Sequence, residues 1–248
     1  MTVNIEAKEW INAHKLQEIE CLVPDIAGNA RGKFIPADKF IKEGMRMPEG
    51  ILTQSITGEF PNDYWELIET LDGDMHLRPD VSTARVIPWS QKPAGQIIHD
   101  CYTGEGEVHP LSSRNILKHI VDLYEKNGMK PILAPEMEFY LVQRNTDPRE
   151  VLLPPVGRSG RLETARQSYS IDATNEFKPF VDTLYECGRT MNLDIDMLIH
   201  ESGAAQFEIN FMHGSALLMA DQVFSFKRMV REVALQHGMH ATFMAKPM

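Results

Sequence analysis

The stretch Ala134-Pro135-Glu136-Met137-Glu138-Phe139-Tyr140-Leu141 alternates polar and apolar side chains after its proline. Alternate residues of a β-strand share a face, so a strand here puts Glu136, Glu138 and Tyr140 on one side. Two carboxylates on the same face are about 7 Å apart. Buried in a hydrophobic strand, such carboxylates need a cation or strong donors beside them. The pattern therefore predicts an acidic strand face that suits Mg²⁺ or Mn²⁺, which prefer oxygen ligands.

A second stretch, Gln206-Phe207-Glu208-Ile209-Asn210-Phe211, has the same alternation, with the amides and the glutamate on one polar face. Glu201 precedes a Ser-Gly-Ala-Ala connection that can bring it near Glu208. The acidic residues on these two strand systems would make a two-metal site: Glu136, Glu138, Glu201 and Glu208. The spacing alone leaves a simpler alternative open, in which both Glu residues of the first stretch lie on a solvated face or an edge strand.

The segments around these stretches predict a β-rich N-terminal part. One opening helix precedes strands at 18–23 and 32–35, which a turn at Pro24-Asp25-Ile26-Ala27-Gly28-Asn29 separates. Further strands are expected at 84–87 and 96–102. Taken together, the helices and strands expected along the chain predict an α+β fold. A small N-terminal domain is expected over residues 1–105 and a second domain over residues 106–248.

Helices become prominent in the second part. Ser112 or Ser113 caps a helix that Gly128 ends, and its apolar face is Ile116, Ile120, Leu123 and Tyr124. A strand pair is expected within 131–142, a loop over 145–168, a helix over 172–191 and a final strand over 241–246. A long helix over 216–237 carries the apolar stripe Met219, Val223, Phe226, Val230 and Val233. We interpret both apolar stripes as core.

Composition narrows the class of protein. The chain has 248 residues, 43% of them apolar, and no apolar run approaches the ~20 residues of a membrane helix, so no membrane partner is expected. A net charge of −10 argues against nucleic acid, which needs clustered Lys and Arg. Cys21, Cys101 and Cys187 are far apart, which predicts free thiols and a cytoplasmic location. The sequence contains no Gly-x-x-x-x-Gly-Lys-Ser/Thr loop, which excludes a P-loop site.

Three ordered stretches resemble motifs of the glutamine synthetase family: 135–139, 201–210 and 240–247. Two more, at 28–33 and 80–84, resemble parts of its N-terminal β-grasp domain. The resemblance implies a β-grasp domain followed by the first part of the catalytic domain. It implies an enzyme that makes γ-glutamyl phosphate from ATP and glutamate, an amine that displaces the phosphate, Mg²⁺ or Mn²⁺ as cofactor, and a homo-oligomer of stacked rings.

The resemblance also assigns roles by motif position. Glu138, Glu201 and Glu208 correspond to ligands of the metal near glutamate, and Glu136 to a ligand of the metal near the nucleotide. The positions near ATP are Asp196, Phe211 and His213. Tyr169 corresponds to a tyrosine near the amine site.

One departure concerns the amine. True glutamine synthetases have an aspartate followed by Gly-Ser-Ser that helps to bind ammonium, and the matching stretch here is Leu52-Thr53-Gln54-Ser55-Ile56-Thr57-Gly58. Thr53 replaces the aspartate and Ile56 a serine. This more apolar site resembles that of family members that glutamylate putrescine or other polyamines, with ammonia-using glutamine synthetase as the near alternative.

The other departure is length, because the family is nearly twice as long and its Gly-Ser-Gly-Met-His motif is absent. We therefore expect an N-terminal half with an incomplete catalytic domain, and no ligase activity in this chain alone. The alternative from another class is a non-catalytic truncated fragment or assembly subunit.

Overall fold

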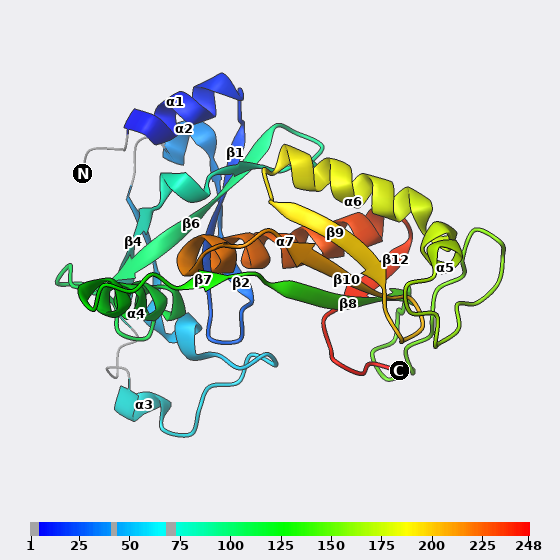
Figure 1. Cartoon of the computed structure of the whole chain (residues 1–248). Helices are drawn as coiled ribbons and strands as arrows, with labels where there is room; N and C mark the ends of the chain where they lie inside the picture. The colour runs from blue at the N-terminus through cyan, green and yellow to red at the C-terminus, as the bar shows by residue number, and fades with distance from the viewer. Residues whose placement is uncertain (1–4, 41–43, 68–72) are drawn as a thin grey trace. The chain divides into compact units, whose positions relative to one another are not determined.

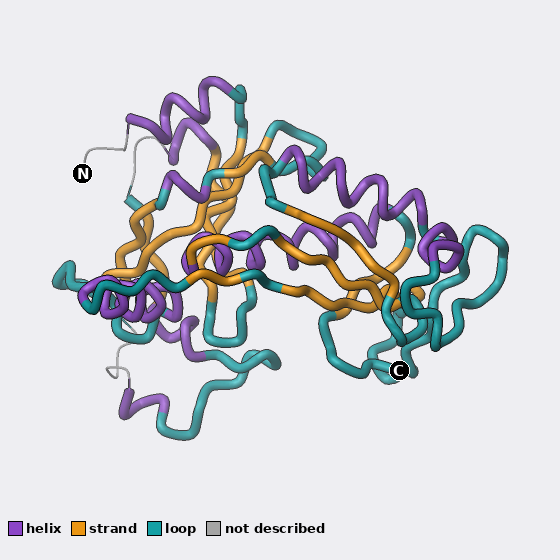
Figure 2. The backbone as a smooth tube through the Cα atoms, in the orientation of Figure 1, coloured by secondary structure: helices purple, strands orange, loops and turns teal. Residues whose placement is uncertain are grey.

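The computed structural model describes residues 5–40, 44–67 and 73–248. They form two compact units, Met1–Pro131 and Ile132–Met248, each with its own sheet (Figures 1 and 2). Both units combine helices with largely antiparallel strands, so the predicted α+β class is confirmed. The division after Pro131 puts helix α4 (Ser113–Lys126) in the N-terminal unit, whereas the division predicted after residue 105 puts it in the second domain. No helix in the described residues has both the length and the apolarity to cross a membrane.

The N-terminal sheet has the strand order β2-β1-β6-β4-β3. Strand β1 (Glu18–Pro24) pairs antiparallel with β2 (Ala30–Pro36) and parallel with β6 (Ala94–Tyr102), which also pairs with the short β5 (Arg85–Val86). These are the four predicted strands. The sequence did not predict β3 (Met45–Pro48) and β4 (Asp74–Pro79), which extend the sheet beyond β6. The short helices of this unit are α1 (Ile5–Ala13), α2 (Ala37–Phe40), η1 (Glu49–Thr53), α3 (Tyr64–Leu67) and η2 (Val81–Thr83).

The predicted turn between β1 and β2 is confirmed, and a buried carboxylate organises it. Asp25 accepts hydrogen bonds from the backbone N–H of Ala27 and Asn29, at 3.0 and 2.8 Å. Arg31 Nε donates to the same side chain at 2.8 Å. Gly28 supplies the positive φ of 72° that the turn needs.

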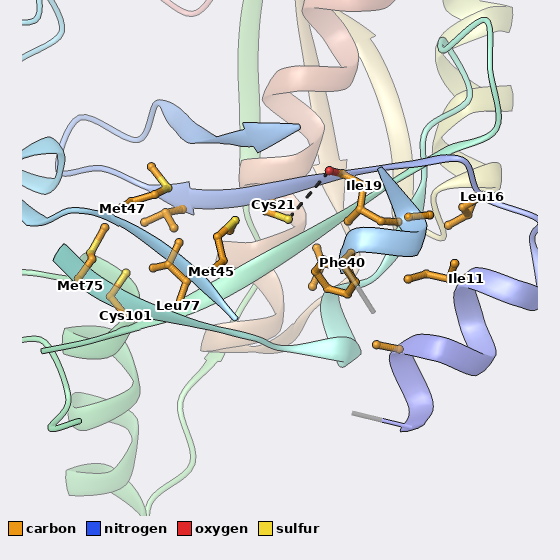
Figure 3. Packing of buried hydrophobic residues seen from close by; sticks show 14 of the residues in the cluster. Ile11, Leu16, Ile19, Cys21, Phe40, Met45, Met47, Met75, Leu77 and Cys101 are labelled. Carbon is orange, nitrogen blue, oxygen red and sulfur yellow. Dashed lines mark hydrogen bonds between the residues drawn. The ribbon is translucent and has the colours of Figure 1, made fainter. Parts of the chain in front are cut away.

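A core of aliphatic, methionine and cysteine side chains, together with Phe40, joins α1 to this sheet (Figure 3). It includes Ile11 of α1, Ile19 and Cys21 of β1, and Met75 of β4. All three cysteines are buried and free, as predicted. Burial raises the thiol pKa of Cys21 to about 12 and that of Cys101 to about 11, so both behave as packing groups rather than nucleophiles.

His99 of β6 makes the stability of this unit depend on pH. The side chain is 1% exposed, and its Nδ1 lies 3.0 Å from the Ile97 carbonyl oxygen. Burial lowers its pKa from 6.5 to about 4, although Asp100 opposes this shift. In the unfolded chain, the His99 imidazole therefore binds a proton below about pH 6.5. In the folded chain it binds that proton only below about pH 4. Stability is lost as pH falls through this window, because the unfolded state binds more protons.

We expect wild type to lose about 3 kcal/mol of unfolding free energy between pH 7 and pH 4 through His99, at about 1.4 kcal/mol per pKa unit. Urea unfolding at several pH values measures this, with His99→Gln beside wild type. The variant should lose less stability over the window. His119→Gln, at an exposed histidine, is the control and should keep the wild-type slope. Equal slopes for wild type and His99→Gln would contradict the assignment.

Helix α4 corrects one prediction. Ser112 caps it as expected, accepting from the Asn115 N–H. Its apolar stripe, however, is exposed rather than core in this structure: Ile116, Ile120, Leu123 and Tyr124 are each at least 40% exposed. The buried side of α4 is polar instead, because Arg114 forms ion pairs there with Asp80 and with Asp100 of β6. Lys118 adds a second ion pair to Asp100.

The second unit contains a four-stranded antiparallel sheet with the order β12-β8-β10-β9. Its strands are β8 (Glu136–Gln143), β9 (Ile195–His200), β10 (Gln206–Phe211) and β12 (Met239–Thr242). The predicted strand pair within 131–142 is wrong in its pairing. Strand β7 (Ile132–Leu133) pairs with β11 (Gly214–Ser215), and β8 pairs with β10 and β12. Only Ala134 and Pro135 separate β7 from β8. A two-residue hairpin turn needs positive φ, which favours Gly or Asn rather than Ala or Pro.

Helices α6 (Lys178–Thr190) and α7 (Ala216–Gln236) cover one face of this sheet. Phe139 of β8 is fully buried, with its ring 6.1 Å from Phe180 of α6 and 6.3 Å from Phe226 of α7. Its register partner Phe207 lies on the same face. The predicted stripe of α7 is core except at Val223, which is half-buried. Because side chains alternate along a strand, the acidic side chains of β8 and β10 point to the opposite face.

The helix predicted over 172–191 is two helices, α5 (Ile171–Glu176) and α6. The break is at Phe177, whose φ of −115° leaves the helical region, and Pro179 is in the first turn of α6. Proline lacks an N–H and its ring clashes with the carbonyl four residues earlier, so the helix has to restart there. The predicted final strand is also displaced: β12 ends at Thr242, and Phe243 packs on Phe139 with ring centroids 5.9 Å apart.

Candidate functional site

Strands β8 and β10 bring two of the predicted carboxylates face to face. Their antiparallel register places Glu138 directly opposite Glu208, and Glu136 opposite Asn210. Residues opposite each other in such a pair have Cβ atoms about 4.5–5.5 Å apart, so the two carboxylates are neighbours. Glu208 is buried, whereas Glu136 and Glu138 are exposed. Of the two possibilities that the sequence left open for the acidic residues of β8, burial is therefore wrong and an exposed face is the one observed.

The electrostatics show that Glu208 lies among like charges. Burial, followed by the charges of Glu136, Glu201 and Glu138, raises the pKa of the Glu208 carboxyl. The only effect that lowers it is a hydrogen bond from the Asn210 side chain. Like charges placed opposite each other destabilise a sheet. Negative charge is therefore concentrated on this face of the sheet, around Glu208.

Gln206 fixes the orientation of Glu138. Its Nε2 donates to Glu138 Oε2 at 2.6 Å, and its Oε1 accepts the Gly203 N–H at 2.7 Å. The backbone closes the same turn, because the Glu201 N–H donates to the Gln206 carbonyl oxygen at 2.8 Å. One amide therefore joins the β8 carboxylate to the turn that carries Glu201.

Gly203 allows this turn to approach β8. A Cβ at Gly203 would lie 2.5 Å from Tyr140 Cε1 and 2.7 Å from Gln206 Oε1, closer than real Cβ contacts allow. Ala205 ends the turn with a φ of 49°, an uncommon value for a residue with a side chain. The close turn and the strained residue together hold Glu201 beside β10.

The loop between β8 and α5 is attached to the backbone beside Glu201. The Arg166 N–H donates to the Ser202 carbonyl oxygen at 2.7 Å, and the Tyr169 N–H donates to the His200 carbonyl oxygen at 2.8 Å. Both residues have positive φ, 69° for Arg166 and 60° for Tyr169. Tyr169, an amine-site candidate, is 72% exposed, so its ring is accessible from solvent.

The nucleotide candidates belong to β9, β10 and the turn after β10. Asp196 is the extra residue of an irregularity in the β9–β10 pairing, where Asn210 faces Met197 and Phe211 faces Ile195. It is exposed, and its charge raises the pKa of Tyr185 after the larger effect of burial. The ring of Phe211 is in the core, 5.3 Å from that of Phe226, so only its backbone could face a nucleotide. His213 is exposed.

The other amine candidates are in the N-terminal unit. Thr53 ends η1, and its hydroxyl donates to the Gly50 carbonyl oxygen at 3.0 Å. Ile56 is 79% exposed in the turn that follows. Both roles stay predictions.

The residues on this face fit a divalent cation by their chemistry. Carboxylates and an amide oxygen are the donors that Mg²⁺ and Mn²⁺ prefer. The buried Asn210 Oδ1 has no hydrogen-bond partner among the described residues, and no basic side chain contributes to the shift of Glu208. No three His, Cys, Asp or Glu side chains of the described ranges converge closely enough to hold an ion as they stand. The four-carboxylate ligand set stays a prediction.

The sequence analysis placed Gln206 and Asn210 on this polar face but gave them no role in the site. The signal was present, since both alternate with Glu208 along β10. What the sequence could not show is which carboxylate each amide reaches, because this depends on the β8–β10 register.

Comparison with known sequences identifies the class of protein that carries this face. Residues 110–248 match the sequence model described as "Glutamine synthetase, catalytic domain". The chain therefore belongs to the glutamine synthetase family, a family of ligases.

Among individual relatives, the chain is 30% identical to gamma-glutamylputrescine synthetase PuuA of Escherichia coli, over 98% of this chain and 52% of that protein. It is 29% identical to a glutamate–isopropylamine ligase of a Pseudomonas species, over 98% and 53%. It is 33% identical to glutamine synthetase of Thermococcus kodakarensis, over 90% and 45%. The chain thus spans about half the length of the curated relatives that it matches.

A solved structure described as a GmaS/ADP complex shares the fold, with a TM-score of 0.77 and 24% identity. The match covers 100% of this chain and 53% of that one, so the fold of the chain is that of about half of a glutamine-synthetase-type protein.

Proposed function

We propose that this chain is the N-terminal part of an ATP-dependent ligase that joins the γ-carboxylate of glutamate to a polyamine or alkylamine. The observation that carries the proposal is the pairing of Glu138 with Glu208 on an open, amide-supported face in a chain of the glutamine synthetase family. In the reaction, the glutamate γ-carboxylate oxygen bonds to the γ-phosphorus of ATP, and ADP leaves. The amine nitrogen then attacks the acyl carbon, phosphate leaves, and the nitrogen gives up a proton to solvent.

The residues of the sheet face have defined parts in this proposal. Glu136, Glu138, Glu201 and Glu208 hold Mg²⁺ or Mn²⁺, which neutralises phosphate charge when bound, the main requirement of phosphoryl transfer. Gln206 keeps Glu138 aimed at the site through its 2.6 Å hydrogen bond. We further propose that Asp196, Phe211 and His213 contact the nucleotide, and that the active protein is a homo-oligomer of stacked rings.

We propose Thr53 and Ile56 of the N-terminal unit as amine-site residues, and Tyr169 of the second unit as a residue near an amine, each by its motif position. An ammonium ion needs charge compensation, whereas a longer amine is held by its apolar chain and its distal charge. Two relatives, those named for putrescine and isopropylamine, support an organic amine. Ammonia is the second candidate, and the 33% identity to a glutamine synthetase favours it.

Phosphate release from ATP with glutamate and one amine at a time tests the proposal. The assay uses the longest product of the gene that contains this chain, with putrescine, spermidine, isopropylamine and ammonium. We expect the highest kcat/KM for an organic amine. Thr53→Asp combined with Ile56→Ser should shift the preference toward ammonium, and Ile5→Ser, at another exposed isoleucine, should not. A higher kcat/KM for ammonium in the wild type would overturn the amine assignment.

The 248-residue chain by itself is the second arm of this assay. We expect no amine-dependent turnover from it. Turnover within tenfold of the longer product would show that these residues are sufficient for the reaction. Failure of both to release phosphate with every amine would overturn the ligase proposal and favour a non-catalytic assembly subunit.

A further inference from the structure

The polar face of β10 contains two amides that differ in one respect. Gln206 uses both ends of its amide, since Nε2 donates to Glu138 and Oε1 accepts from the Gly203 backbone. Asn210 uses only one end. Its side chain donates to Glu208, which leaves Oδ1 as the free end. That oxygen is buried, and no donor among the described residues reaches it.

An unpartnered buried acceptor is costly, at about 1–3 kcal/mol, and native structures keep few of them. The side chains nearest to Asn210 cannot supply a donor while they are ionised. Its register partner across β8 is Glu136, and its neighbour on the same face of β10 is Glu208. Carboxylates only accept hydrogen bonds. These side chains therefore leave Oδ1 to a water molecule or to a bound ligand.

The backbone around Asn210 is also irregular. The β9–β10 register shifts between Asn210 and Phe211, because β9 has the extra residue Asp196 at this point. Bulges reorient side chains and are frequent beside active sites. The bulge of β9 therefore lies next to Asn210 in the sheet.

We propose that Asn210 Oδ1 is a neutral oxygen ligand of the divalent ion assigned to Glu136, the residue opposite Asn210 on β8. This inference rests on the proposed metal site and adds a residue that the motif comparison did not assign. A hard cation accepts amide oxygens together with carboxylates, and a neutral ligand completes its shell without adding repulsion to a face that already has four carboxylates. The Nδ2 end of the same amide keeps Glu208 in place.

Two substitutions separate the two ends of the amide. Asn210→Asp keeps an oxygen at the ligand position and loses the donor to Glu208. Asn210→Leu has a similar volume and loses both. The control is Gln143→Leu, the same type of change at the far end of β8, where the amide donates to the Pro154 carbonyl oxygen. The probe is Mn²⁺ alone, with free Mn²⁺ measured by electron paramagnetic resonance on the 248-residue chain, and circular dichroism checks the fold.

We expect Asn210→Asp to bind Mn²⁺ within threefold of wild type and Asn210→Leu to bind it at least about tenfold more weakly. If the leucine variant does not fold, Asn210→Ala removes the same oxygen without bulk and should show the same loss. Equal losses for the Asp and Leu variants would overturn the inference, because Asn210 would then act only by holding Glu208. No loss in either variant would overturn it too. A wild-type chain that binds no Mn²⁺ would instead overturn the metal site of the proposed function.

Discussion

Replacing Glu138 and Glu208 together by glutamine is expected to weaken Mn²⁺ binding by roughly two orders of magnitude, because ligand charge sets the affinity of oxygen sites over several decades. The same double variant should be more stable than wild type without metal, by about 1 kcal/mol. Its neutral side chains no longer repel each other across the β8–β10 register. Binding and stability should thus change in opposite directions. Isothermal titration with Mn²⁺ and urea unfolding in chelator measure the two effects.

The matched control is Glu150→Gln with Glu186→Gln, two exposed glutamates of the same unit that lie outside the β8–β10 pair. It should leave both quantities unchanged. Mn²⁺ affinity equal to wild type in the Glu138 and Glu208 variant would remove these residues from the ligand set. A loss of metal-free stability would show that the carboxylates are held by favourable contacts rather than forced together.

Arg114→Met is expected to destabilise the N-terminal unit by about 3–5 kcal/mol, the usual cost of removing one partner from a buried ion pair. The Arg114 side chain is 3% exposed and pairs with Asp80 at 2.7 Å and with Asp100. Burial tends to raise the pKa of Asp80, but hydrogen bonds from Ser82 and Arg114 outweigh it and lower the pKa to about 2. Without the guanidinium, Lys118 is the one cationic side chain among the described residues that still pairs with the two carboxylates. Urea unfolding measures the loss.

A triple variant, Arg114→Met with Asp80→Asn and Asp100→Asn, should recover most of that stability, since it removes the unbalanced charges as well. Arg149→Met is the control, because its ion pair with Asp147 is at the surface and its loss should not be measurable. A change below about 1 kcal/mol in Arg114→Met would mean that solvent replaces the guanidinium at this position.

Local patterns predicted the elements of the site well. The alternation along 136–141 and 206–211 defined β8 and β10 and the polar face of each, because a strand has a strict two-residue period. Partners and register were not predictable. Nothing in the sequence states that Glu138 lies opposite Glu208, or that Gln206 reaches Glu138, because both follow from pairing segments distant along the chain.

Two of the predictions made from the sequence, for the apolar stripe of α4 and for one continuous helix over 172–191, are wrong for different physical reasons. The stripe of α4 was identified correctly as a face, but periodicity shows which residues lie together and not what covers them. The helix buries Arg114 instead, because Asp80 and Asp100 come from other elements. The missed break at Phe177 was visible in the sequence, since Pro179 disfavours a continuous helix through that turn.

The pairing of β8 with β10 affects the lifetime of the native state. Gln206 and Glu138 are 68 residues apart, so their contact requires a long loop to close before any contact energy is gained. An ion that binds only after the strands have paired stabilises the native state but not the transition state. The ion should therefore slow unfolding, which lengthens the lifetime of the native state, and should leave the folding rate unchanged.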